Sequence, residues 1–154
     1  MTQLLVIRLR GTVNMTHDVE ASLERLGLLR RYAATIVPST KDYIGLLRKA
    51  AAFVAWSEVD KGTIASVLKA RGELSGGRRI EEEWLKARGF MDVDDLAAKI
   101  ADGSVDLRHL EGLKPFFRLH PPLKGFKRST IKHYRAGGML AEYPELPKLA
   151  ERMI

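Results

Sequence analysis

The order of segments in the first 58 residues constrains the fold more than any other feature of this sequence. Apolar side chains alternate with a period of two in residues 3–10, and shorter apolar runs follow at 32–37 and 53–56. The two stretches between these runs carry apolar residues at helical spacing, each preceded by a Ser or Thr able to cap a helix. The order β-α-β-α-β predicts an α+β fold, a small sheet with helices packed on it.

The first predicted strand is expected to be buried on one side only. Leu5, Ile7 and Leu9 share one face, whereas the opposite face ends in Arg8 and Arg10. The apolar faces of all five segments together predict a core of Leu5, Ile7, Val19, Leu23, Leu26, Ile36, Leu46, Leu47 and Val54.

After residue 58 the pattern changes to short amphipathic segments separated by glycines. We therefore expect a core of residues 1–58 and an extension of residues 59–154. The extension is expected to hold short helices across 63–112, a long basic loop across 113–138 and a closing helix near 146–153.

Charge is distributed unevenly along the chain. The net charge is +7, but segment 113–138 alone has seven Lys and Arg residues with no Asp or Glu. Segment 79–111 has nine carboxylates against five basic residues, a net charge of −4. A basic region of this kind favours a polyanionic partner. We expect the acidic segment to face away from it.

The basic segment also carries aromatic side chains between its cations, among them Phe117, Phe126 and Tyr134. Cations neutralise phosphates while aromatic rings stack on unpaired bases, a combination suited to irregular RNA. The alternative is a solvated surface loop without a ligand. Since few apolar residues are available to hold 113–138 in place, we expect it to be mobile in the free protein and ordered on RNA.

The sequence gives no support for catalysis, a cofactor or a metal. There is no cysteine, the four histidines lack metal-ligand spacing, and neither a P-loop nor a G-x-G-x-x-G motif is present. Glu81, Glu82 and Glu83 are explained by a helix N-terminus. We therefore expect no enzymatic activity and no small-molecule substrate. No run of about 18 apolar residues and no leader pattern occurs, which favours a cytoplasmic protein without a membrane partner.

Several motifs, in their order and spacing, resemble archaeal large-subunit ribosomal protein thirty, a family shared with bacterial protein thirty and eukaryotic large-subunit protein seven. These motifs are Arg8–Asn14, Leu23–Leu28, Gly45–Lys49, Phe53–Glu58, Arg118–Pro122 and the pair Gly137-Gly138. Two positions depart from the usual family pattern. Leu46 replaces a methionine of similar volume, and Ser57 replaces a common glycine, which puts the family's turn after the third strand in doubt.

The resemblance implies a three-stranded sheet with two helices on one face. It also implies binding to large-subunit ribosomal RNA, a position close to the 5S RNA and contacts with neighbouring ribosomal proteins. Matched residue by residue, the RNA contacts implied are Arg8, Arg10, Asn14, Arg30, Arg31, Arg48, Lys49, Arg118, His120, Lys127, Arg128, Lys132 and Arg135.

The expected function is that of a structural constituent of the large ribosomal subunit. Two alternatives are a free RNA-binding regulatory protein outside the ribosome and an RNA-processing enzyme. A regulator that reads a short sequence is expected to show a recognition helix or an RNP-type aromatic sheet, and the sequence shows neither.

Overall fold

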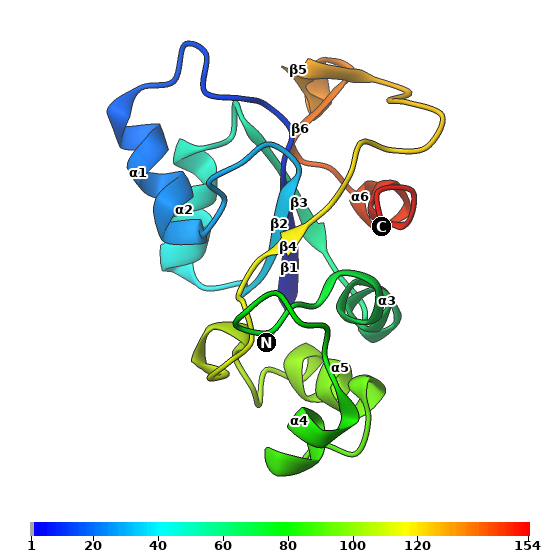
Figure 1. The fold of residues 1–154 in the computed structure, drawn as a ribbon. Coiled ribbons are helices and arrows are strands. Elements are labelled where there is room, and N and C mark those ends of the chain that lie inside the picture. Colours follow the sequence, from blue (N-terminus) through cyan, green and yellow to red (C-terminus); the bar gives the residue numbers. More distant parts are fainter. Residues whose placement is uncertain (1) are drawn as a thin grey trace.

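The computed structural model describes residues 2–154, shown in Figure 1. The strands are β1 (Gln3–Arg8), β2 (Ala33–Pro38), β3 (Val54–Glu58), β4 (Phe117–Arg118), β5 (Ser129–His133) and β6 (Gly138–Glu142). The helices are α1 (His17–Leu26), α2 (Lys41–Lys49), α3 (Lys61–Arg71), α4 (Glu82–Ala87), α5 (Val93–Ala101) and α6 (Leu146–Glu151), with 3-10 turns η1 (Leu107–His109) and η2 (Tyr134–Ala136). The α+β class is confirmed. None of these helices is long and apolar enough to cross a bilayer.

The strands form one sheet in the order β4-β2-β1-β3-β6-β5. β1 lies between β2 and β3 and is antiparallel to both, so that Leu5 stands opposite Ile36 on one side and Ser57 on the other. The three-stranded unit that the resemblance implies is therefore present as β2-β1-β3. The extension adds β4 to one edge, and β6 followed by β5 to the other. Helices outnumber strands in the extension, as expected, and these strands are an addition to that expectation.

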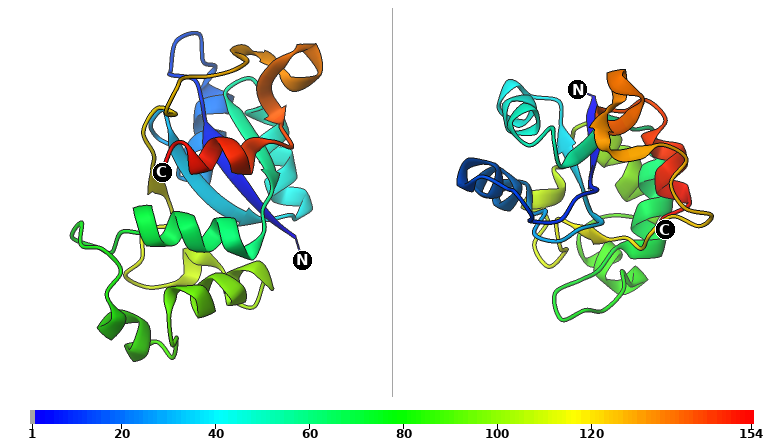
Figure 2. Two further views of the ribbon diagram at one scale, coloured as in Figure 1. Left: turned by 90° about the vertical axis from the view of Figure 1, so that its right-hand side faces the viewer. Right: turned by 90° about the horizontal axis from the view of Figure 1, so that it is seen from above.

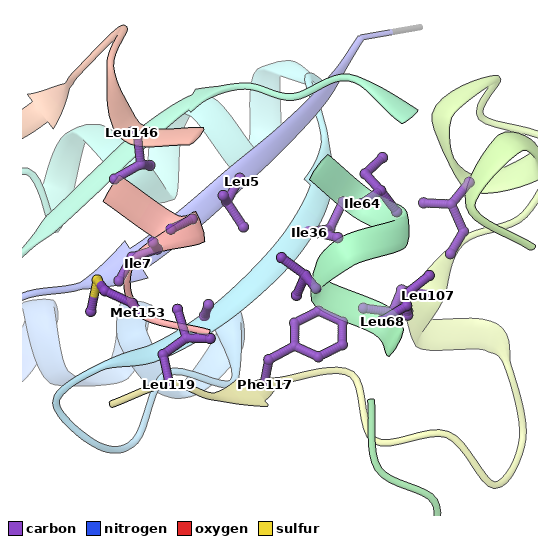
Figure 3. Close-up of a cluster of buried hydrophobic side chains, with 14 of the residues drawn as sticks. Leu5, Ile7, Ile36, Ile64, Leu68, Leu107, Phe117, Leu119, Leu146 and Met153 are labelled. Carbon is purple, nitrogen blue, oxygen red and sulfur yellow. The ribbon is translucent and has the colours of Figure 1, made fainter. Parts of the chain in front are cut away.

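Both faces of the sheet are covered, and every residue of β1 is buried. The expectation that the first strand is buried on one face only is therefore wrong. On one face, Leu4 and Val6 pack in a cluster with residues of α1 and α2. On the other, Leu5 and Ile7 pack with residues of α3, α6 and the segment around Phe117, as Figure 3 shows. In Figure 2, α3 and α6 lie across the sheet from α1 and α2. The second layer comes from the extension, which the period of β1 alone could not reveal.

The predicted core is mostly confirmed. Seven of the nine residues are buried, and the other two, Val19 and Leu46, are partly buried and pack against the α1–α2 cluster. Ser57 lies inside β3, and its φ is not positive. The missing glycine therefore does not disturb the backbone at this point.

Segment 113–138 contains more regular structure than the expected basic loop. It contains β4, β5 and η2, and Phe117 is fully buried. The Phe126 ring stacks on Tyr32 with centroids 6.2 Å apart. Gly138 is needed for the close approach of β6 to β5, since a Cβ there would lie 1.8 Å from the Lys132 carbonyl oxygen. These contacts join parts of the basic segment to the rest of the fold, and its mobility in the free protein stays a prediction.

Candidate nucleic-acid interface

Three loops meet at one end of the sheet: the loop after β1, the loop before β2 and the loop before β3. The N–H of Leu9, just after β1, donates to the carbonyl oxygen of Phe53 at 3.0 Å, and the N–H of Tyr32 donates to that of Arg8 at 2.7 Å. In Figure 1 the loop after β1, the segment leading to β5, and β5 itself lie at this end, while α4 and α5 lie at the opposite one. We call it the cationic end, because most of the RNA-binding residues expected from the sequence lie there or on the segments that lead to it.

Arg8 differs from the other candidates because it is buried, with only 3% of its surface exposed. Its Nε donates to the carbonyl oxygen of Arg10 at 2.9 Å, and its Nη1 donates to that of Leu28 at 2.8 Å. Burial lowers the pKa of Arg8 from its usual value, partly opposed by Glu20. This guanidinium holds two loops together and leaves little surface for a phosphate.

Arg10 and Arg31 are held in place by contacts with the fold, although Arg10 is only partly buried and Arg31 is exposed. Arg10 Nη1 donates to the Ala52 carbonyl oxygen at 3.1 Å, and its guanidinium carbon lies 5.0 Å from the centre of the Phe53 ring. Arg31 Nε donates to the carbonyl oxygen of Leu9 at 3.0 Å. These contacts fix the orientation of the two side chains. Each guanidinium keeps further N–H groups that can donate to another partner. Asn14 lies between them in sequence, exposed and with a φ of 58°.

A pocket of about 300 Å³ brings together candidates far apart in sequence. Arg30 and Arg31 lie before β2, and Arg118 reaches the same pocket because Ala33 pairs with Arg118 across the β2–β4 edge. The other lining residues are Gly27, Leu29, Tyr32, Ala33, Phe116 and Leu119. We call this hollow the arginine pocket. It contains no carboxylate.

A second hollow, of about 430 Å³, places Arg48 beside Arg135. Trp56 and Tyr134 also line it, as does the carboxylate of Glu142. Its charge is therefore mixed, unlike that of the arginine pocket. Lys49 does not line this hollow and is exposed near the C-terminal end of α2.

The remaining candidates lie along and before β5. Lys127, Arg128 and Lys132 are exposed, and the guanidinium of Arg128 lies 5.5 Å from the centre of the Tyr134 ring. His120 is partly buried, and its backbone N–H donates to the carbonyl oxygen of Met153. His120 is thereby tied to the segment after α6.

Comparison with known proteins points to one family. The family described as ribosomal protein L30p/L7e matches residues 4–54. Similar proteins include large ribosomal subunit protein uL30 of Ignicoccus hospitalis, 44% identical over 87% of this chain and 86% of that protein. The proteins of the same name from Methanoculleus marisnigri and Korarchaeum cryptofilum are 39% and 37% identical over 96% and 98% of this chain, and 97% and 94% of theirs.

This chain belongs to the uL30 family. The resemblance seen in its motifs is thus confirmed, and so is the expectation that it is not an enzyme. Within residues 2–154 no group of three or more His, Asp or Glu side chains is placed to hold a metal ion.

Two features of this uL30 chain escaped the sequence analysis. Arg152, after α6, donates from Nη1 to the carbonyl oxygens of Leu123 and Gly125 at 3.3 and 3.2 Å and so braces the basic segment. Tyr32 has a φ of 65°, a conformation uncommon for a residue other than glycine. No local pattern marks either residue, because both roles depend on partners distant in sequence.

Proposed function

We propose that this chain is a structural constituent of the large ribosomal subunit that binds and stabilises folded ribosomal RNA through its cationic end. The observation that carries the proposal is the convergence of Arg30, Arg31 and Arg118 on one pocket without a carboxylate. Three guanidinium groups so close together repel one another unless an anion compensates them. The names of the similar proteins support the large subunit as the setting.

Most candidate residues are suited to direct contact with RNA phosphates, because they are charged and exposed. We assign this role to the partly exposed Arg10 and to the exposed Arg30, Arg31, Arg48, Lys49, Arg118, Lys127, Arg128, Lys132 and Arg135. Asn14 and His120 carry polar groups suited to hydrogen bonds with RNA. Arg8 is assigned a positioning role instead, because its hydrogen bonds fix the loops that carry Arg10 and Arg30.

The acidic segment 79–111 is proposed to face solvent or a basic neighbouring protein, since its carboxylates would repel phosphates. Its position opposite the cationic end supports this orientation. From the family resemblance we also propose that the RNA bound includes, or lies next to, the 5S RNA. In this view residues 1–58 form the RNA-binding core, and residues 59–154 complete the cationic end.

Sedimentation with ribosomal subunits tests the proposal. The full chain is expected to travel with large subunits in moderate salt and to be absent from small subunits. Crosslinking from Arg30 and Arg118 should then yield large-subunit RNA. The share of crosslinks to 5S RNA shows whether the chain lies next to the 5S RNA. A chain that stays at the top of the gradient, or travels with both subunits alike, contradicts the proposal.

A further inference from the structure

Two apolar side chains of the arginine pocket, Leu29 and Phe116, lie outside both core clusters, and the Phe116 ring lies 5.9 Å from the guanidinium carbon of Arg118. Leu29 is 64% exposed, and Phe116 is only partly buried and packs in neither core cluster of residues 2–154. The next residue, Phe117, is by contrast fully buried. A hollow lined by apolar side chains and a few convergent polar groups is the usual form of a ligand-binding pocket.

The pocket wall next to these groups is fixed in position. Tyr32 has a positive φ, and its ring stacks on Phe126 and lies 4.8 Å from the guanidinium carbon of Arg31. The N–H of Leu119 donates to the carbonyl oxygen of Tyr32 at 3.1 Å, which ties the two sides of the pocket together. Unusual backbone conformations held by surrounding contacts gather at ligand-binding sites.

The charge around the pocket determines which ligand suits it. All three of its charged lining residues are arginines, and neither Arg30 nor Arg118 forms an ion pair with any carboxylate of residues 2–154. The ligand therefore combines a flat or apolar part with negative charge. An unpaired nucleotide has both, because its base stacks or packs on apolar side chains while its phosphates lie beside arginines.

We propose that the arginine pocket receives one unpaired, unstacked base of the bound RNA, with Leu29 and Phe116 contacting the base and Arg30 and Arg118 its flanking phosphates. A volume of about 300 Å³ lies at the lower end of the range for small-ligand pockets, which suits a single base and not a base pair. This inference rests on the proposed function and narrows it: the protein recognises a bulged or looped nucleotide, in addition to the phosphate backbone.

An apolar side chain of a neighbouring protein is the competing occupant. It would satisfy Leu29 and Phe116 but would leave the charge of the three arginines uncompensated. An acidic peptide would supply charge without a flat group to stack. The nucleotide satisfies both requirements, so it is the occupant that the lining favours.

The test compares two RNA probes that carry equal charge. The full chain is titrated with a single-stranded uridine hexanucleotide and with an abasic hexamer of the same length and phosphate number. The native protein is expected to bind the base-containing probe roughly 5- to 100-fold more tightly, the range that stacking of one base provides. Leu29→Ala and Phe116→Ala should each lower this ratio about threefold or more by removing apolar contact.

Leu123→Ala is the matched control. Leu123 is the same residue type, 66% exposed and on the basic segment, but does not line the pocket. Its replacement should leave the ratio unchanged. Leu29→Ala is not expected to affect folding because the side chain is so exposed, and thermal melting confirms that each variant is folded.

The outcomes separate the inference from the proposed function. A native ratio near one, or a ratio that neither pocket variant changes, overturns the base pocket even when the chain binds large-subunit RNA with normal salt dependence. A chain that does not bind large-subunit RNA at all instead overturns the proposed function, and the base pocket with it.

Discussion

The guanidinium of Arg8 donates from Nη1 to the carbonyl oxygen of Leu28 at 2.8 Å and so joins the end of β1 to the turn after α1. Arg8→Met keeps an unbranched apolar side chain in place of the aliphatic part of Arg8 but removes both of its hydrogen bonds to backbone carbonyls. Because buried acceptors are then left unpaired, we expect a loss of about 1–3 kcal/mol in the free energy of unfolding. Chemical denaturation measures this loss. If the variant is as stable as the native chain, Arg8 does not brace the loops.

Replacement of the five cations of the basic segment tests their share of RNA binding. The variant changes Arg118, Lys127, Arg128, Lys132 and Arg135 to Ala. For every phosphate that is no longer neutralised, the slope of log affinity against log salt should fall by roughly 0.7–0.9. Stability should hardly change, because these side chains are exposed.

A salt series with large-subunit RNA provides the measurement, and Lys86→Ala with Lys99→Ala is the control, because both lie on the acidic segment far from the cationic end. Unchanged affinity and slope in the five-residue variant would restrict RNA binding to the residues of the first 58.

Leu23 anchors α1 on the sheet, with 1% of its surface exposed in the α1–α2 cluster. Leu23→Ala should cost about 2–5 kcal/mol of unfolding free energy, since a cavity remains among well-packed neighbours. Val13→Ala serves as the control, because Val13 is 77% exposed. A loss of stability in Leu23→Ala no larger than in the control would remove Leu23 from the core.

The pair of Glu73 and Lys114 predicts a pH dependence. Lys114 Nζ lies 2.9 Å from Glu73 Oε2, and this hydrogen bond lowers the pKa of Glu73 from its ordinary value of 4.5. A carboxylate with a lowered folded pKa stabilises the protein above pH 4.5, and this contribution is lost as the pH falls through the folded pKa.

Glu73→Gln should therefore be less stable than the native chain near neutral pH, by about 0.5–1 kcal/mol because the pair is partly exposed to solvent. In acid, once the pH lies below the lowered folded pKa of Glu73, the two proteins should become equally stable. Urea titrations at several pH values measure the difference, with Glu82→Gln on the exposed face of α4 as control. A constant difference at every pH contradicts the assignment.

Short-range sequence patterns predicted the helices α1 and α2. The helices after Thr16 and Thr40 follow from apolar spacing, and the Thr40 hydroxyl accepts from the N–H of Tyr43 as a helix cap does. The strands that the extension adds to the sheet were harder to predict. β4 and β6 pair with β2 and β3 across more than eighty residues, and β4 is only two residues long.

The candidate site was predicted in part. Arg30, Arg31 and Arg118 were identified from sequence, but their convergence depends on the β2–β4 pairing. The sequence pattern placed Arg8 on the exposed face at the end of a strand, but Arg8 is buried. The alternation of residues along a strand does not show which loops cover its end, so this burial could not be predicted. Phe116 was indistinguishable in sequence from its buried neighbour Phe117.

The strands added at both edges of the sheet also affect when the chain can fold. β6 and α6 lie within the last 17 residues, yet Leu146 and Met153 pack with Leu5 and Ile7 of β1. During synthesis, the part of this face that α6 covers stays exposed until residues 146–153 have left the ribosome that makes the chain. Pairing between such distant residues slows folding, and an exposed strand face invites aggregation. The newly made protein is thus most vulnerable before α6 emerges, and a chain that lacks Leu146 and Met153 should leave that part of the face open.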